Sequence, residues 1–224
     1  MKHVMIPDTQ VFPGSKLEHL LAAGKYIRKH KPDKVIIIGD WWDMPSLSSY
    51  DTAGDKGWED KDVKADLDIG WEAMKRFLSA IRRPKYSPEI RFAVGNHEDR
   101  ITRAANSAET RAMSGFLDLK ETILEPLQDL DVHPHEFLDI FVLDGICYSH
   151  YFVNPTSLFP NPIGGTIESK LKNLGHSFTM GHQQHKQSGE VFTCTGERRR
   201  GLVCGRFYQD HHEYLGPQKN AQSW

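Results

Sequence analysis

Five short hydrophobic segments of this chain run directly into a residue whose side chain can bind a metal ion. They end in Ile-Pro-Asp8, Ile-Gly-Asp40, Val-Gly-Asn96, Tyr-Ser-His150 and Met-Gly-His182. A carboxylate beside an apolar core carries a desolvation cost unless a cation or a strong hydrogen-bond donor compensates it. Because ligands of open α/β sheets gather at the carboxyl ends of the strands, these five side chains can converge. The pattern therefore predicts a metal centre.

Carboxylates and imidazoles around one cleft suit a pair of divalent cations. Such ions lie about 3.5–4 Å apart and act together on the attacking and leaving oxygens of an in-line displacement. One bridging carboxylate usually holds the two ions together, and Asp40 is the natural candidate for that position.

The elements that must position these residues alternate in the first half of the chain. Strands are predicted over residues 3–6, 35–38 and 90–94, and helices after the capping-box pattern Ser15-x-x-Glu18 and over residues 63–81. Strands alternating with helices in this way predict a parallel sheet with right-handed crossovers.

Hairpins are predicted in the second half. Asp144-Gly145, a strong two-residue turn signal, separates predicted strands over residues 137–143 and 146–152. A short strand is predicted over residues 178–180, and a further pair over 191–195 and 202–208, with Arg198, Arg199 and Arg200 in the solvated turn between them. Residues 154–165 hold three prolines and two glycines and are predicted to form a loop at the rim of the site.

Length and composition indicate a single domain over residues 1–224. The chain is 38% hydrophobic and 26% charged, as in ordinary globular proteins. A net charge of -2 argues against binding nucleic acid through overall charge, although a local basic patch or a metal can still hold a phosphate. Three cysteines without a Cys-x-x-Cys, no signal peptide, and no apolar run of the ~20 residues that a membrane span needs favour a cytoplasmic protein.

The order and spacing of these motifs resemble those of the calcineurin-like metallophosphoesterase superfamily. Gly-Asp40-Trp-Trp-Asp43, Gly-Asn96-His97-Glu98, a lone His150 and Gly-His182-Gln-Gln184 follow its pattern. The residues after the second and third motifs resemble phage-encoded members. The resemblance implies an α/β fold, a four-layer α/β/β/α sandwich with a parallel first half and a hairpin-rich second half.

The resemblance also implies a role for each ligand. Asp8 would bind the first metal only, and Asp40 would bridge both metals. The ligands that complete the second metal would be Asn96, His150 and His182.

Four further residues are expected around the bound phosphate. The resemblance implies that His97 donates a proton or stabilises charge there, oriented by Asp43. Arg100, one turn further on a predicted helix, is placed to reach a phosphate. Of the neighbouring Trp41 and Trp42, one is expected in the core, and Trp42 is expected to wall the cleft or stack on a base.

Two glutamines depart from the family pattern, and both belong to the first metal. Gln10 and Gln184 stand where the family has histidines. A glutamine carbonyl is a neutral, hard oxygen donor, which favours Mn²⁺, Mg²⁺ or Ca²⁺ over Zn²⁺ and predicts a weak first site. For the pair of ions Mn²⁺ is the first choice, with Mg²⁺, Zn²⁺ or iron as alternatives. His185 would replace Gln184 as the ligand if the loop is shifted by one residue.

Together these features predict a metal-dependent phosphoesterase that hydrolyses phosphodiester bonds with a metal-activated water at a dinuclear site. DNA, RNA or a nucleotide is the expected substrate. Met44-Pro45 stands where serine/threonine phosphatases carry an Arg-Gly that grips a monoester, which argues against a phosphomonoesterase or protein phosphatase.

A second hypothesis is a non-catalytic binding or scaffold protein that keeps the fold with a degenerate first metal site. The glutamines motivate it, and the presence of His97 and Asp43 counts against it. The phage-like motifs place the protein in the host cytoplasm if a phage encodes it. The sequence predicts no oligomeric state.

Overall fold

The computed structural model describes residues 1–48, 61–107 and 117–208. Within these ranges the chain forms an α/β structure with two β-sheets and five α-helices. The predicted α/β class is therefore confirmed. Among the described residues, no helix combines the length and apolar composition needed to cross a lipid bilayer.

The first sheet is wholly parallel, as the alternating pattern predicted. Its strand order is β1-β2-β3-β4, with β1 at His3–Ile6, β2 at Lys34–Ile37, β3 at Glu89–Ala93 and β4 at His133–His135. The predicted strands differ from these bounds by one residue at most, and β4 was not predicted.

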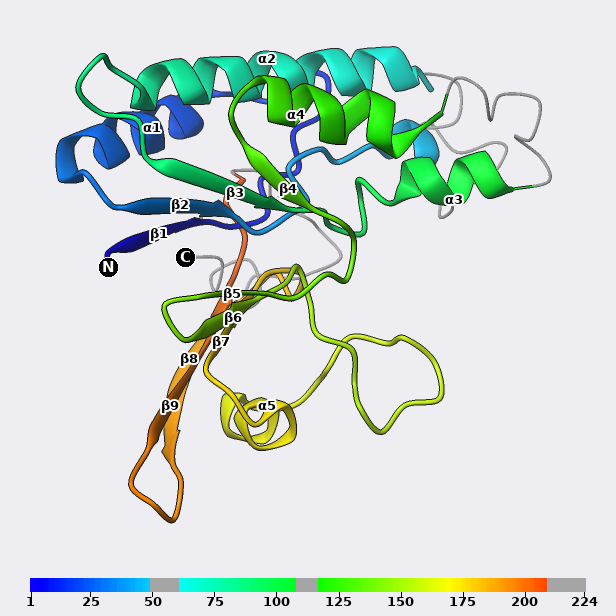
Figure 1. Ribbon diagram of the computed structural model, residues 1–224. Coiled ribbons are helices and arrows are strands. Elements are labelled where there is room, and N and C mark those ends of the chain that lie inside the picture. Colours follow the sequence, from blue (N-terminus) through cyan, green and yellow to red (C-terminus); the bar gives the residue numbers. More distant parts are fainter. Residues whose placement is uncertain (49–60, 108–116, 209–224) are drawn as a thin grey trace.

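Helices cover one face of this sheet (Figure 1). They are α1 (Glu18–His30), α2 (Val63–Ile81) and α4 (Glu125–Asp129), the last preceded by a π-helical turn, Lys120–Leu124. Leu20, Ile37 and Phe77 are among the buried residues of the apolar cluster between sheet and helices. The helices α1 and α2 pack so closely that a side chain at Gly24 would lie 2.7 Å from Ala80 Cβ. The short α3 (Arg100–Asn106) follows β3 beyond the sheet edge.

The start of α1 corrects the capping-box prediction. Leu17 occupies the N-cap, and no side chain caps the helix there. The Ser15 hydroxyl instead accepts a hydrogen bond from the Phe12 backbone N–H at 3.0 Å. Ser15 therefore stabilises the turn that precedes α1 and does not cap the first turn of the helix.

The second sheet is mixed, in the order β5-β6-β7-β9-β8. Its strands are β5 (Phe141–Leu143), β6 (Ile146–Tyr148), β7 (Phe178–Met180), β8 (Lys186–Phe192) and β9 (Arg198–Cys204). The hairpin around Asp144-Gly145 is confirmed, although its strands are shorter than predicted. Parallel pairs join β6 to β7 and β7 to β9.

The β8–β9 hairpin corrects a second prediction. Arg198, Arg199 and Arg200 belong to β9 rather than to a turn, and they pair with Phe192, Val191 and Glu190 of β8. Glu190 also forms ion pairs with Arg198 (4.0 Å) and Arg200 (3.4 Å). Backbone pairing together with a cross-strand carboxylate lets charged residues occupy this strand.

Two more apolar clusters hold the second sheet in place. Ile36, Ile38 and Ala93 of the first sheet pack against Phe141 and Tyr148 of the second. On the other side, α5 (Ile167–Leu174) covers the sheet, with Leu171 packed in a cluster that includes Phe178, Met180 and Val203. Figure 1 shows the two sheets between α1, α2 and α4 at the top and α5 at the bottom.

Candidate metal centre and adjoining cavity

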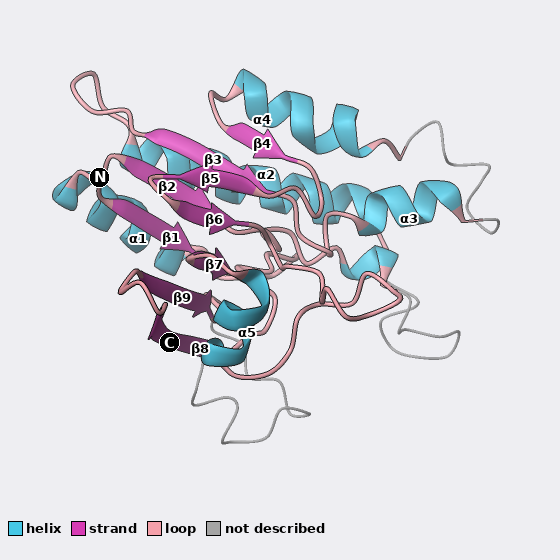
Figure 2. Cartoon of the chain, turned by 60° about the horizontal axis from the view of Figure 1, so that its bottom comes forward, coloured by secondary structure: helices cyan, strands magenta, loops and turns pink. Residues whose placement is uncertain are grey.

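The predicted ligands follow the carboxyl ends of five strands. Asp8 comes two residues after β1, and Asp40 and Asn96 come three after β2 and β3. His150 and His182 each come two residues after β6 and β7. In Figure 2 these strands point toward the same side of the molecule, where the loops gather.

The ligand atoms of Asp40, His150 and His182 all lie within 4.8 Å of one another. The Nε2 atom of His150 is 3.3 Å from Asp40 Oδ1 and 3.0 Å from Asn96 Oδ1. The Nδ1 atom of His182 is 2.7 Å from the same Asn96 oxygen. One carboxylate, one amide oxygen and two imidazoles therefore converge on one point.

This donor set fits a divalent cation. The Nδ1 atom of His150 lies 2.8 Å from the Ile38 carbonyl oxygen, to which it donates, so Nε2 is aimed at Asp40 and Asn96. Orientation of a ligand imidazole through its other nitrogen is usual at metal sites. Mixed carboxylate, amide and imidazole ligands suit Mn²⁺, Zn²⁺ or iron.

Burial and charge shift the pKa values of the whole cluster. Burial, and next the charge of Asp40, raise the pKa of Asp8 to about 8. Burial acts to lower the pKa of His150, but the neighbouring Asp40 carboxylate outweighs it and raises that pKa to about 9. Burial and the nearby positive His150 lower the pKa of His182 to about 4. Two buried carboxylates at one point thus favour a bound proton or cation beside them.

The Asp40 carboxylate keeps its negative charge. Burial acts to raise its pKa, but the charges and hydrogen bonds of His150 and His97 outweigh burial and hold it below the ordinary value. The residue itself has φ of 50°, a left-handed conformation that costs energy for a non-glycine residue. A strained turn at β2 therefore presents a charged carboxylate to both histidines.

Glu98 fixes that turn, a role the sequence reasoning did not assign. Its buried carboxylate accepts hydrogen bonds from the backbone N–H groups of Asp40 (3.0 Å), Trp41 (2.7 Å), Trp42 (3.0 Å) and Gly95 (2.8 Å). Glu98 thus joins the loops after β2 and β3. Its place directly after Asn96-His97 was the only sequence signal for this function.

His97 lies beside the centre, against Asp43 as the resemblance implied. Its Nδ1 atom is 2.9 Å from Asp43 Oδ1, and its Nε2 atom is 3.8 Å from Asp40 Oδ2. Burial acts to lower its pKa, but Asp40 and the hydrogen bond to Asp43 raise it above the ordinary value. His97 is therefore well suited to hold a proton near neutral pH.

Arg100 approaches the same imidazole from α3. Its Nη2 atom is 3.3 Å from His97 Nε2, and Nη1 donates to the carbonyl oxygens of Asp43 (2.7 Å) and Met44 (3.1 Å). The bonds to the two carbonyl oxygens fix the guanidinium next to the point where a phosphate would meet His97.

The prediction that Trp42 walls the cleft is wrong. Trp41 and Trp42 are both completely buried. The indole N–H of Trp42 donates to the Leu67 carbonyl at 3.3 Å, and the ring packs edge-on against Trp71. Trp42 is a core residue beneath α2 because the chain turns inward immediately after Asp40.

The residues that the resemblance assigned to a first metal are Asp8, Gln10 and Gln184. The Asp8 carboxylate accepts the Gln184 amide N–H at 2.9 Å and the His182 backbone N–H at 3.0 Å. Gln10 has a half-buried side chain, and its backbone N–H donates to the Asp40 carbonyl at 2.8 Å. Gln184 is thus the residue against Asp8, whereas His185 bonds to the Gln183 carbonyl at 2.6 Å.

Tyr208 adds a contact that sequence reasoning missed. Its hydroxyl donates to Gln184 Oε1 at 2.8 Å. With the amide in this orientation, nitrogen rather than oxygen faces Asp8. Gln184 therefore presents an N–H to Asp8 and no oxygen to a cation there, whereas Asn96 presents its oxygen to His150 and His182.

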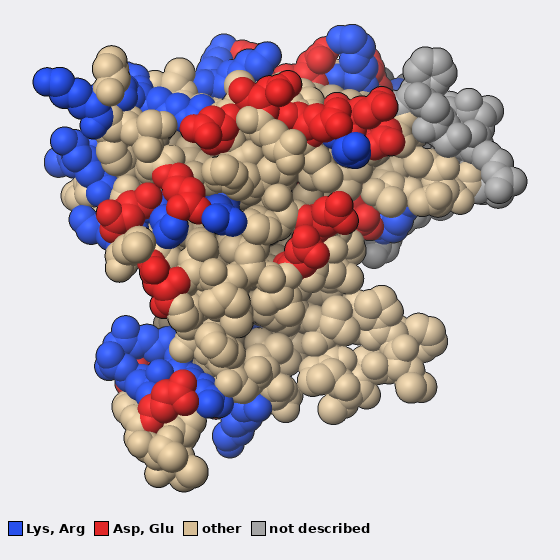
Figure 3. Space-filling model, in the orientation of Figure 1, with Lys and Arg blue, Asp and Glu red and all other residues tan. Residues whose placement is uncertain are grey.

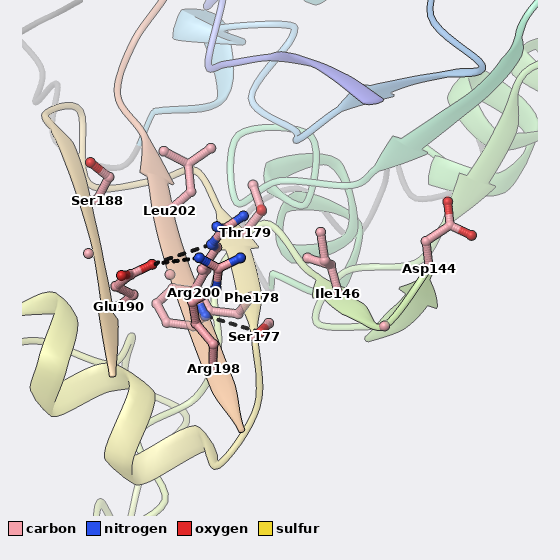
Figure 4. A pocket seen from close by; sticks show the side chains of 13 residues that line it. Asp144, Ile146, Ser177, Phe178, Thr179, Ser188, Glu190, Arg198, Arg200 and Leu202 are labelled. Carbon is pink, nitrogen blue, oxygen red and sulfur yellow. Dashed lines mark hydrogen bonds and ion pairs between the residues drawn. The ribbon is translucent and has the colours of Figure 1, made fainter. Parts of the chain in front are cut away.

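A cavity of about 460 Å³ adjoins the centre. Asn96 and His182 form part of its wall, together with Arg100, Arg103, Tyr151 and Asn161. A larger hollow of about 780 Å³ is lined by residues of β7, β8 and β9, where Glu190 forms ion pairs with Arg198 and Arg200 (Figure 4). No predicted site residue lines that hollow.

Comparisons with known proteins identify one relative by sequence. No family model matches the chain. A stretch of 97 residues, 43% of this chain, is 35% identical to the Gene 54 protein of Mycobacterium phage L5 and covers 36% of it. The match thus spans about a third of the length of that curated relative.

A solved structure, the Pseudomonas putida nuclease MPE, aligns with 94% of this chain and 78% of its own, at 13% identity and a TM-score of 0.39. So distant a likeness carries no argument about activity. Any inference about function therefore depends on the geometry of the candidate metal centre.

Proposed function

We propose that this protein is a metal-dependent phosphoesterase that cleaves phosphodiester bonds in nucleic acids or nucleotides. One observation carries the proposal: Asp40, Asn96, His150 and His182 converge at one point, with His97 3.8 Å from the Asp40 carboxylate. A cation site with a proton-holding imidazole beside it suits the transfer of a phosphoryl group to water.

Each residue of the centre has a proposed role. Asp40, Asn96, His150 and His182 would hold the second metal, Mn²⁺ for preference. Asp8, Gln10, Asp40 and Gln184 would hold the first metal more weakly. Bound ions would lower the pKa of water and neutralise the charge of the phosphate oxygens.

The remaining chemistry belongs to His97 and its neighbours. His97 Nε2 gives a proton to the leaving oxygen, and Asp43 fixes the ring through Nδ1 at 2.9 Å. The guanidinium of Arg100, 3.3 Å from His97 Nε2, attracts the phosphate to the same point.

We further propose that residues 1–224 form a single domain with the four-layer sandwich of the calcineurin-like metallophosphoesterases. Three apolar clusters support this arrangement. They lie between helices and the first sheet, between the two sheets, and between the second sheet and α5.

Paired nitrophenyl esters test the choice of substrate. Diester hydrolysis should exceed monoester hydrolysis at saturating Mn²⁺, because Met44-Pro45 follows Asp43 and supplies no guanidinium to grip a dianion. Clearly faster hydrolysis of nitrophenyl phosphate than of bis-nitrophenyl phosphate would indicate a phosphomonoesterase instead of a phosphodiesterase.

The Gln184–Asp8 contact favours one rival, a scaffold protein with a degenerate first site. A scaffold would bind at most one ion and hydrolyse neither ester. Turnover of the diester at a rate that His97→Ala reduces would exclude it.

A further inference from the structure

The 460 Å³ cavity opens directly onto the candidate centre. Asn96 and His182 belong to its wall, and both are proposed ligands of the better-formed metal position. A volume of this size lies within the range of small-molecule sites. Whatever occupies the cavity would therefore lie next to the reacting phosphate.

One wall of the cavity is cationic. Arg100 and Arg103 lie three residues apart on α3, with Asp99 as the neighbouring carboxylate. Arg103 donates to the Asn96 carbonyl oxygen at 2.7 Å, and its Nε atom is 3.3 Å from Asp99 Oδ2. Because its side chain is 56% exposed, Arg103 is accessible to an anion in the cavity.

Another part of the cavity wall is aromatic, formed by Tyr151 and Phe137. Tyr151 packs edge-on against Phe137, with ring centroids 5.5 Å apart, and 4.8 Å from the His182 ring. The Tyr151 hydroxyl donates to the Pro160 carbonyl oxygen at 3.4 Å, which connects the cavity wall to the loop at residues 154–162.

That loop, residues 154–162, presents two apolar side chains to solvent. Leu158 is 98% exposed and Phe159 is 70% exposed. The loop is nonetheless closed internally, since the Asn154 N–H donates to the Asn161 carbonyl oxygen at 2.8 Å. In Figure 1 it projects on the same side of the molecule as α3, and in Figure 3 it forms a projection without charged residues.

We propose that this cavity and loop hold a nucleotide of single-stranded nucleic acid next to the scissile phosphate. A flanking phosphate binds at Arg103, and an unstacked base packs on Phe159 and Leu158. Arginines beside exposed aromatic rings are how proteins bind single strands without reading sequence. A duplex keeps its bases stacked and cannot offer one to the loop. The inference rests on the proposed function, because it assigns the substrate of that centre.

Binding without turnover provides the test. Anisotropy of a fluorescein-labelled oligo-dT is measured with the full chain in chelator, so that hydrolysis does not contribute. Phe159→Ala should weaken binding about 5-fold or more, as expected for one stacked base. Phe192→Ala is the matched control, because Phe192 is 64% exposed on the β8–β9 hairpin; it should change binding less than twofold.

The phosphate contact has its own readout. Arg103→Ala should weaken binding and lower the slope of log affinity against log salt by about 0.7, the value for one phosphate of a single strand. Arg103→Lys should keep that slope, which separates a phosphate contact from a purely structural role at Asn96. Arg76→Ala is the matched control, since Arg76 is 54% exposed and pairs with Glu72 as Arg103 does with Asp99.

Three results would overturn the inference. The first is that the parent protein does not bind oligo-dT at tens of micromolar. The second is that it binds a duplex with equal affinity. The third is that the Phe159 and Arg103 variants lose no more affinity than their controls. Failure of the proposed function is separately visible. If the substitutions change oligo-dT binding as expected but no diester is hydrolysed in Mn²⁺, the nucleotide site would be supported and the phosphoesterase activity refuted.

Discussion

The amide of Gln184 is hydrogen-bonded to the carboxylate of Asp8, with Nε2 2.9 Å from Oδ2. The Tyr208 hydroxyl donates to the other end of the amide at 2.8 Å. A hydroxyl can donate or accept, so Tyr208 can also bond to the amide after it rotates by 180°. Rotation would turn the oxygen toward Asp8, where a cation could bind both. The orientation of Gln184 would therefore couple Tyr208 to the proposed first metal position.

Replacing both glutamines tests whether they face a metal. Gln10→His with Gln184→His should tighten the weaker metal position and shift its preference toward Zn²⁺ or iron, because an imidazole replaces a neutral amide. The two changes should be non-additive, since residues that share one ion are energetically coupled. Titration calorimetry on the single and double variants measures both effects. A double variant that binds its weaker ion no more tightly than the parent would show that these residues do not face a metal.

His97→Ala should reduce the chemical step by about 10²–10⁴-fold, as is usual for a general acid. Metal content should stay near that of the parent, because His97 is not one of the converging ligands. Single-turnover rates with a poorly activated leaving group measure the effect. His133→Ala, which removes an exposed imidazole from β4, is the control. An unchanged rate in His97→Ala would remove His97 from the chemistry.

Glu98→Gln tests the clamp on the loops after β2 and β3. Glutamine offers one acceptor oxygen where Glu98 uses two to bind four backbone N–H groups. Each buried donor left without a partner costs about 1–3 kcal/mol. We expect a lower free energy of unfolding in urea together with weaker metal binding, because the loop of Asp40 loosens. Parent-like stability would mean that the clamp contributes nothing.

The stability of protein stripped of metal should fall as pH rises. His150 has a pKa of about 9 in the folded chain against 6.5 for an unperturbed histidine. Its contribution to the free energy of unfolding is therefore complete below pH 6.5 and is lost as the pH rises toward 9. Asp8, raised from 3.8 to about 8, acts in the same direction. Melting temperatures in chelator between pH 6 and 9.5 should decline, and His150→Gln should flatten the curve. A parent curve that rises over this range would contradict the assignment.

The convergence of the candidate ligands could be predicted from the sequence because their positions depend on local rules. An apolar strand that ends in Gly-Asp or Gly-His must present that residue at the sheet edge, so Asp40 and His182 could be placed without knowing the packing. The parallel sheet likewise follows from alternation of strand and helix. The resemblance added the pairing of His97 with Asp43.

Features that depend on packing between distant segments were not predictable. Whether Trp42 faces the cleft or the core depends on α2, and whether Arg198–Arg200 form a turn or a strand depends on β8. Tyr208 meets Gln184 only through the fold, and the cavity is formed by α3, Phe137, Tyr151 and the loop at 160–162. No short sequence pattern encodes such contacts.

The most direct test of the metal centre follows activity and metal occupancy together. Protein stripped by a chelator is titrated with Mn²⁺, and diester hydrolysis is measured alongside bound Mn²⁺ by electron paramagnetic resonance. Asp40→Asn is compared with Asp68→Asn, which alters a carboxylate on the surface of α2 paired with Lys64. We expect activity to appear only as Mn²⁺ binds in the parent and in Asp68→Asn, and both binding and activity to be lost in Asp40→Asn. Full activity in the stripped parent, or normal Mn²⁺ binding in Asp40→Asn, would contradict the proposed centre.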